Sequence, residues 1–213
     1  GSYPPRQVNG IMVGCFLTPS TVGYDEQGKR QDKVFTHPPE LSAKINQWAG
    51  GEYLVDIPRF RTEDKADLLK QMYEMTRQHF EVIRQLLKTE RDWDFFMFTE
   101  MGTDRMHHGF WKFHDPQHPK YEAGNPYESA IHDYYVYLDG EIGSVLSLLD
   151  DETAVMVVSD HGVKRMDGGI CVNEWMIKEG LLAIKDDHPT RITPMEKVEV
   201  DWPRTKAWGE GGY

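Results

Sequence analysis

Hydrophobic positions along the chain form two kinds of pattern: stripes with helical spacing and short continuous apolar runs. From Thr62 to Leu87, apolar residues recur every three to five positions, which predicts an amphipathic helix with Thr62 as its N-cap. A second stripe from Tyr127 to Leu149 predicts another long helix. Shorter helices are expected from Leu41 to Trp48 and from Glu174 to Glu179.

The continuous apolar runs predict β-strands. Trp93 to Thr99 (WDFFMFT) and Thr153 to Val158 (TAVMVV) have the composition of strands buried on both faces. Asn9 to Leu17 and Tyr53 to Ile57 are further candidates. Because long helices alternate with the two main runs, we expect an α/β fold in which helices cover both faces of a mostly parallel sheet.

This pattern predicts one α/β catalytic-core segment over residues 1–213. Residues 1–60 are irregular and rich in Pro, Gly and aromatic side chains. Within them, residues 18–60 are a candidate cap or insertion. In sheets of this kind, ligands gather beyond the carboxyl ends of the strands, so the loops after the two main runs are the places to look for chemistry.

Each of these loops carries an aspartate and a histidine. Asp104 and His108 follow the first run, and Asp160 and His161 follow the second. A carboxylate with an imidazole suits Zn²⁺ or Mn²⁺. An i,i+4 spacing puts Asp104 and His108 on one face of a helix, whereas Asp160 and His161 need a non-helical turn, which Gly162 permits. The four residues are therefore the candidate metal ligands.

Other interpretations stay open at this point. A single Asp–His pair is more often a turn with a hydrogen-bonded histidine, and the recurrence of the pair after two runs is what favours metal. Arg105 and His107 are candidate substrate-binding residues. Arg105 could instead pair with a carboxylate, and His107 competes with His108 as the ligand. A third class of protein, a non-catalytic metal-binding or interaction module, would keep the fold without the chemistry.

Charge and composition narrow the partners. The chain has 35 acidic and 24 basic residues and a formal net charge of −11. This disfavours a nucleic acid polymer, whose phosphates need Lys or Arg, but a small phosphorylated substrate stays compatible if a metal supplies positive charge. No apolar stretch reaches the roughly 18 residues of a membrane span, so no membrane partner is expected. The first residues lack a signal peptide, which favours a cytoplasmic location.

Longer strings around these motifs resemble the alkaline phosphatase superfamily, and within it the bacterial and archaeal type I phosphodiesterase/nucleotide pyrophosphatase family. The resemblance implies an alkaline-phosphatase-like fold and metal-dependent hydrolysis of phosphate esters, with a nucleotide as one candidate substrate. Ser2, in a Ser-x-Pro-x-Arg pattern, also allows a sulfatase-like hydrolase of the same superfamily. The strings that carry the family resemblance are residues 3–10 (YPPRQVNG), 16–20 (FLTPS), 100–111 (EMGTDRMHHGFW), 159–162 (SDHG) and 206–213 (KAWGEGGY).

The resemblance also implies two divalent metal ions, Zn²⁺ or Mn²⁺. One ion takes an Asp, the His four residues later and a further His; Asp104 and His108 match the first two. The other takes an early Asp, the nucleophilic Thr or Ser, and the pair matched by Asp160 and His161. In the family the unmatched residues lie before Tyr3 and after Tyr213. We therefore expect a segment incomplete at both ends, with its nucleophile outside the chain, partial metal occupancy and little or no activity.

Overall fold

The structure of the protein is a computed structural model. It describes residues 5–14, 21–24, 27, 30–32, 34–185, 189, 191 and 193–209. The chain divides into two compact units, Gly1–Arg165 and Met166–Tyr213. No helix in the part of the chain that is described has the length and apolar character needed to cross a membrane.

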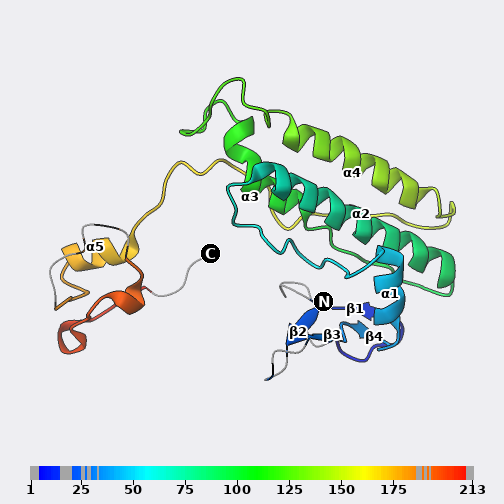
Figure 1. Cartoon of the computed structure of the whole chain (residues 1–213), viewed down its shortest axis with the longest axis horizontal. Coiled ribbons are helices and arrows are strands. Elements are labelled where there is room, and N and C mark those ends of the chain that lie inside the picture. Colours follow the sequence, from blue (N-terminus) through cyan, green and yellow to red (C-terminus); the bar gives the residue numbers. More distant parts are fainter. Residues whose placement is uncertain are drawn as a thin grey trace. The chain divides into compact units, whose positions relative to one another are not determined.

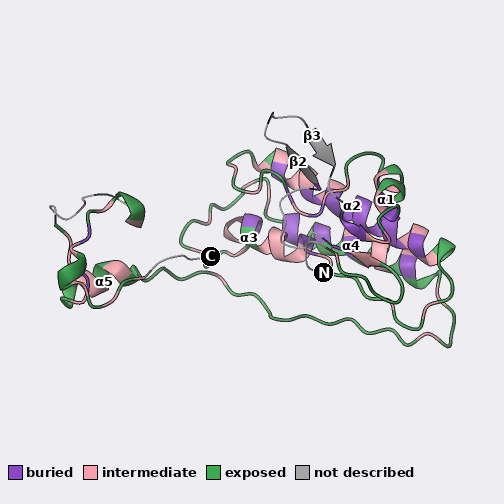
Figure 2. Cartoon of the chain, turned by 90° about the horizontal axis from the view of Figure 1, so that it is seen from below, coloured by how far each residue is buried: buried purple, intermediate pink, exposed green. Residues whose placement is uncertain are grey.

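The described residues of the first unit form four helices (Figure 1): α1 (Leu41–Ala49), α2 (Lys65–Thr89), α3 (Gly102–His114) and α4 (Ala130–Leu146). Helix α2 contacts each of the other three, and α3 also packs on α4. The apolar stripes of α2, α3 and α4 meet in one buried cluster, while α1 packs on the end of α2 in a second cluster; both are visible as purple segments of the helices in Figure 2. The fully buried members of the first cluster include Leu68, Met72, Met75, Met106, Phe110 and Tyr134. The helices predicted from stripes are thus confirmed.

The ends of these helices follow from local chemistry. Helix α1 ends at Gly50, whose φ of 80° is left-handed, and the Gly51 N–H donates to the Asn46 carbonyl over 2.9 Å. Helix α2 begins later than predicted, because the Asp64 carboxylate accepts the Asp67 N–H over 3.0 Å. The Thr62 hydroxyl accepts the Asp64 N–H instead, so the prediction of Thr62 as the N-cap is wrong.

The strands of the described residues form only short antiparallel pairs. Strand β1 (Met12–Val13) pairs with β4 (Thr36–His37), and β2 (Val22–Tyr24) pairs with β3 (Arg30–Asp32). The described part of the chain is therefore mixed helix and strand without the predicted parallel sheet. Strand β1 lies within the predicted strand Asn9–Leu17, and the end of that run lies outside the described residues.

The two main apolar runs, Trp93–Thr99 and Thr153–Val158, are the clearest corrections. Neither forms a strand, and their side chains are largely exposed, with Phe95 at 78% and Met156 at 82%. The second run belongs to the long exposed trace that follows α4 (Figure 2). A strand buried on both faces needs a hydrogen-bonded neighbour and covering helices; here the helices bury their stripes against one another instead.

The second unit is small. It contains α5 (Val172–Lys178) and the short 3₁₀ helices η1 (Met195–Lys197) and η2 (Trp202–Arg204). An antiparallel bridge joins Ile184 to Val200. Helix α5 confirms the helix predicted near residues 174–179. In the first unit, the described part of residues 18–60 carries β2, β3, β4 and α1, while Tyr53–Ile57 is a loop and not the predicted strand.

Candidate metal centre

Helix α3 carries the first predicted pair. Asp104 and His108 lie on one face, with His108 Nε2 3.4 Å from Asp104 Oδ1, as the i,i+4 spacing predicts. Two ligand atoms of a tetrahedral ion, each bound at about 2.1 Å, lie about 3.4 Å apart. The Asp104 side chain is 33% exposed and that of His108 is 65% exposed. This pair therefore fits one edge of a divalent metal site and is open to solvent.

Asp160 and His161 lie in the irregular segment after α4, and both are exposed. His161 Nε2 is 3.9 Å from Asp160 Oδ2, while His161 Nδ1 lies 2.8 Å from the Gly162 carbonyl oxygen. That carbonyl can only accept, so Nδ1 carries a proton, and in the neutral ring Nε2 keeps its lone pair. A backbone carbonyl on the other ring nitrogen is the usual support of a metal-ligating histidine.

Nearby charges, including that of Asp104, affect the pKa values of His161 and His107. The bond to the Gly162 carbonyl, the charge of Asp160 and the charge of Asp104 raise the pKa of His161. Burial lowers the pKa of His107, and His108 and His161 lower it further, against the opposing pull of Asp104. Asp104 is therefore one of the charges that act on His161. Among the described residues, however, no three His, Cys, Asp or Glu side chains gather closely enough to hold an ion.

His107 and His108 point to different partners. His107 Nε2 lies 3.1 Å from the Tyr135 hydroxyl, and its ring meets that of Trp111 edge-on at 5.7 Å. Only His108 is paired with Asp104 among these two neighbours. The geometry therefore favours His108 over His107 as the ligand beside Asp104. A contact between His107 and substrate stays a prediction.

Arg105 lies between two carboxylates. Its Nε and Nη2 donate to Asp56 over 2.8 and 2.5 Å, and its Nη1 donates to Asp104 Oδ2 over 3.1 Å. The hydrogen bond to Asp56 is the main cause that raises the pKa of Arg105, so the guanidinium stays charged. Of the two roles considered for Arg105, the structure shows the ion pair. Nothing in the sequence indicated Asp56 as the partner of Arg105, because it lies far from Arg105 along the chain, in an irregular segment.

A buried polar network holds the start of α3. Glu100 Oε1 accepts the Gly102 N–H over 2.7 Å and the Thr76 hydroxyl over 3.1 Å, and Glu100 Oε2 lies 3.0 Å from His79 Nδ1. His79 Nε2 lies 2.6 Å from the Leu54 carbonyl oxygen. Neither Glu100 nor His79 was predicted as a functional residue. The features that could have indicated them are the position of His79 on the apolar stripe of α2 and the position of Glu100 at the end of an apolar run.

In the folded chain the pKa of His79 is raised and the pKa of Glu100 is lowered. Burial lowers the pKa of His79, but the hydrogen bond and charge of Glu100 outweigh it, so the pKa is raised. Burial raises the pKa of Glu100, but the hydrogen bond and charge of His79 outweigh it, so the pKa is lowered. Both ring nitrogens of His79 face acceptors. The pair is therefore an imidazolium with a carboxylate.

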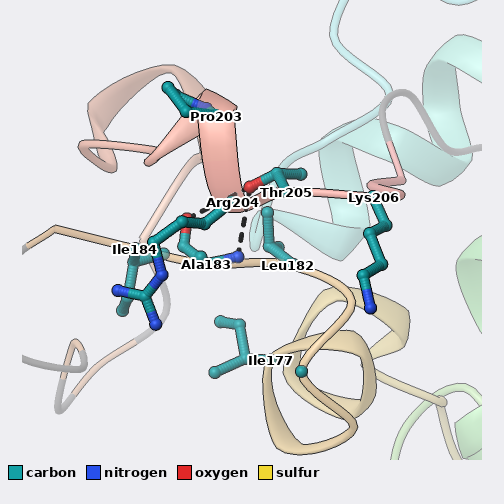
Figure 3. Close-up of a pocket in the computed structure, with 9 residues that line it drawn as sticks. Ile177, Leu182, Ala183, Ile184, Pro203, Arg204, Thr205 and Lys206 are labelled. Carbon is teal, nitrogen blue, oxygen red and sulfur yellow. Dashed lines mark hydrogen bonds between the residues drawn. The ribbon is translucent and has the colours of Figure 1, made fainter.

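The described residues include hollows near His108 and in the second unit. One of about 340 Å³ borders His108 and is lined by Arg61 and Lys65 among others. The other, of about 570 Å³, lies within the second unit between α5 and η2 (Figure 3). There, Arg204 and Lys206 extend on either side of Ala183 and Leu182, and the Thr205 hydroxyl accepts the Ala183 N–H over 3.1 Å. None of the predicted ligands lines this second hollow.

Comparison with known proteins adds one finding. A model of the type I phosphodiesterase / nucleotide pyrophosphatase family matches residues 5–208, a range that includes both Asp–His pairs. No curated protein and no solved structure matches the chain. Ser2, the residue on which the sulfatase-like alternative rests, lies outside both the matched range and the described residues.

Proposed function

The chain belongs to the type I phosphodiesterase / nucleotide pyrophosphatase family, and we propose that Asp104, His108, Asp160 and His161 are its ligands for divalent metal in phosphate ester hydrolysis. The observation that carries this proposal is the 3.4 Å distance between His108 Nε2 and Asp104 Oδ1 on α3; a second Asp–His pair is formed by Asp160 and His161, at 3.9 Å. A phosphate ester hydrolase is what the family implies. The residue roles, the metals and an alkaline-phosphatase-like complete fold are part of the proposal.

Each proposed ligand has a definite task. Asp104 Oδ1 and His108 Nε2 supply two donors from one rigid helix, and His161 Nε2 supplies another beside Asp160. When bound, divalent ions would neutralise the phosphoryl oxygens and stabilise the leaving alkoxide. The exposure of His108, Asp160 and His161 leaves room for a small phosphorylated substrate, such as a nucleotide, to reach them. Zn²⁺ and Mn²⁺ are the ions that these donors favour.

The number of donors limits the expected activity. Neither Asp–His pair has a third His, Cys, Asp or Glu close to it among the described residues. Each pair would therefore hold an ion with fewer ligands than the three of typical catalytic zinc sites. We propose that the 213-residue chain binds divalent metal weakly. Its turnover of phosphate esters should be slow or absent.

Hydrolysis of bis-p-nitrophenyl phosphate with added Zn²⁺ or Mn²⁺ tests this proposal. We expect slow release of p-nitrophenol or none. Any release should be abolished by EDTA and by His108→Ala. Fast turnover would contradict the weak-site proposal. Release that persists in EDTA would contradict metal dependence altogether.

p-Nitrophenyl sulfate in the same assay separates the alternative chemistry. A phosphate-specific site should leave the sulfate ester intact, whereas its cleavage would favour the sulfatase-like hydrolase built on Ser2. If the chain shows neither hydrolysis nor metal binding that depends on His108, it is better described as a non-catalytic interaction module that keeps the family sequence.

A further inference from the structure

The two oxygens of Asp104 have different surroundings. Oδ2 accepts a hydrogen bond from Arg105 Nη1 over 3.1 Å, whereas Oδ1 faces His108 Nε2 at 3.4 Å. A carboxylate on a helix surface rotates freely about its last bond unless one oxygen is held. The contact with Arg105 therefore selects which oxygen of Asp104 is presented beside His108.

Arg105 is in turn fixed by Asp56. The two carboxylate oxygens of Asp56 accept from Nε and Nη2 of Arg105 over 2.8 and 2.5 Å, the bidentate geometry that holds a guanidinium plane in one orientation. Both side chains are 18% exposed. The Arg105 guanidinium also lies 5.3 Å from the Phe60 ring centroid. The fork can thus reach Asp104 from one direction only.

Asp56 is itself held against the helical core. Its Oδ1 accepts the Ile57 N–H over 2.7 Å. Two residues earlier, the Leu54 N–H donates to Gln78 Oε1 over 2.9 Å, and the Leu54 carbonyl oxygen lies 2.6 Å from His79 Nε2. This segment is therefore anchored to α2, and Asp56 is a fixed point from which Arg105 reaches α3.

We propose that Asp56 is a positioning residue of the metal centre, which acts through Arg105 to hold Asp104 Oδ1 toward the ion shared with His108. The inference rests on the proposed function, because it assumes that Asp104 and His108 bind metal. It assigns Arg105 to the support of a ligand and not to a phosphate group. Supports of this kind typically change metal affinity by about 10–100-fold when they are removed.

Asp56→Asn in the full chain tests the proposal. The amide nitrogen of asparagine cannot accept a hydrogen bond, so Arg105 loses its bidentate partner and Asp104 its orientation. We expect the Kd for Mn²⁺, measured from the electron paramagnetic resonance of free Mn²⁺, to rise about tenfold or more. Arg105→Lys, which keeps the charge but loses the planar fork, should weaken binding in the same way and serves if Asp56→Asn does not fold.

Glu141→Gln is the matched control. Glu141 pairs with Arg84 over 2.5 Å, and these side chains are 16% and 19% exposed, close to the values for Asp56 and Arg105. This second pair joins α4 to α2 and touches no proposed ligand. Its loss should lower thermal stability to a similar extent and leave the Kd for Mn²⁺ unchanged, so that a general loss of packing is distinguished from a loss of ligand orientation.

The outcomes distinguish a failure of the positioning role of Asp56 from a failure of the proposed metal site. If wild type and Glu141→Gln bind Mn²⁺ and Asp56→Asn binds it equally well, the positioning role is wrong while the metal site stands. If Asp56→Asn weakens the binding of inorganic phosphate but not of Mn²⁺, Arg105 is a phosphate contact and the proposal is overturned. If wild type shows no saturable Mn²⁺ binding, the proposed function fails and the positioning role falls with it.

Discussion

Gly102→Ala is expected to destabilise the folded chain by about 3 kcal/mol, the upper part of the usual range for overpacking a filled core. A Cβ at residue 102 would overlap the Tyr134 hydroxyl and lie 2.6 Å from Glu100 Oε1. Both groups are buried and hydrogen-bonded, so neither has space to withdraw. Urea unfolding followed by circular dichroism would measure the change in the free energy of unfolding.

Gly140→Ala gives the opposite expectation from the same substitution. Gly140 lies in α4, and an added Cβ would meet nothing within 4 Å. Alanine is favoured over glycine in a helix interior by about 1 kcal/mol, so this variant should be more stable than wild type. If both variants moved stability in the same direction by a similar amount, the close packing of Tyr134 and Glu100 around Gly102 would be wrong.

The buried His79–Glu100 pair should make stability depend on pH in a particular way. The pKa of His79 is raised on folding, so its contribution is fully present below the unfolded value of about 6.5 and is lost as pH rises through the folded pKa. The pKa of Glu100 is lowered, so its contribution is present above about 4.3 and is lost as pH falls through the folded pKa. The stabilisation by this pair should therefore be greatest between about pH 4.3 and 6.5.

Comparison of wild type with His79→Gln isolates this effect from the other histidines. The difference in their free energies of unfolding should shrink above about pH 6.5, with a slope of at most about 1.4 kcal/mol per pH unit, the value for one proton. His132→Gln is the control, since His132 lies exposed beside Asp133. A pH-independent difference for His79→Gln would show that folding leaves the pKa of His79 unchanged, and a difference that grows as pH rises toward 6.5 would show that the buried imidazole is neutral; either result would contradict the prediction.

The helices of this protein could be predicted because their signal is local. Leu68, Met72 and Met75 repeat with the period of one helix face, and burial of that face against α3 and α4 needs no information beyond the stripe. The end of α1 was equally readable, because glycine is the residue that adopts the left-handed conformation seen at Gly50. The start of α2 was misplaced because a carboxylate competes with a nearby hydroxyl as the cap, and α4 is shorter at both ends than the predicted range.

The parallel sheet was wrong for the described residues because a strand is not a local structure. The run that contains Phe95 has strand composition, yet a strand exists only where another backbone edge accepts its hydrogen bonds. In the described residues no strand pairs with this run, and it stays exposed. Sequence composition reports the preference of a segment but not the presence of its partner.

The candidate site likewise has a local part that the sequence predicted and a non-local part that it did not. The spacing of Asp104 and His108 is local, and it predicted their shared helix face. Their supports are not local: Asp56 contacts Arg105 of α3, and His79 contacts Glu100, which in turn accepts the Gly102 N–H at the start of α3. Nothing in the spacing of either residue identified its partner.

The most direct test of the account is a titration of the chain with Mn²⁺, followed by the paramagnetic broadening of the histidine ring signals in NMR spectra. If Asp104, His108, Asp160 and His161 hold metal, the His108 and His161 signals should broaden at lower Mn²⁺ than the signal of His132. His132 is an internal control, because its Nδ1 lies 3.1 Å from Asp133 Oδ1 and it is 72% exposed. Broadening of His132 before or together with His108 and His161 would show that the two motifs bind metal no better than a chance surface pair, and would contradict the account.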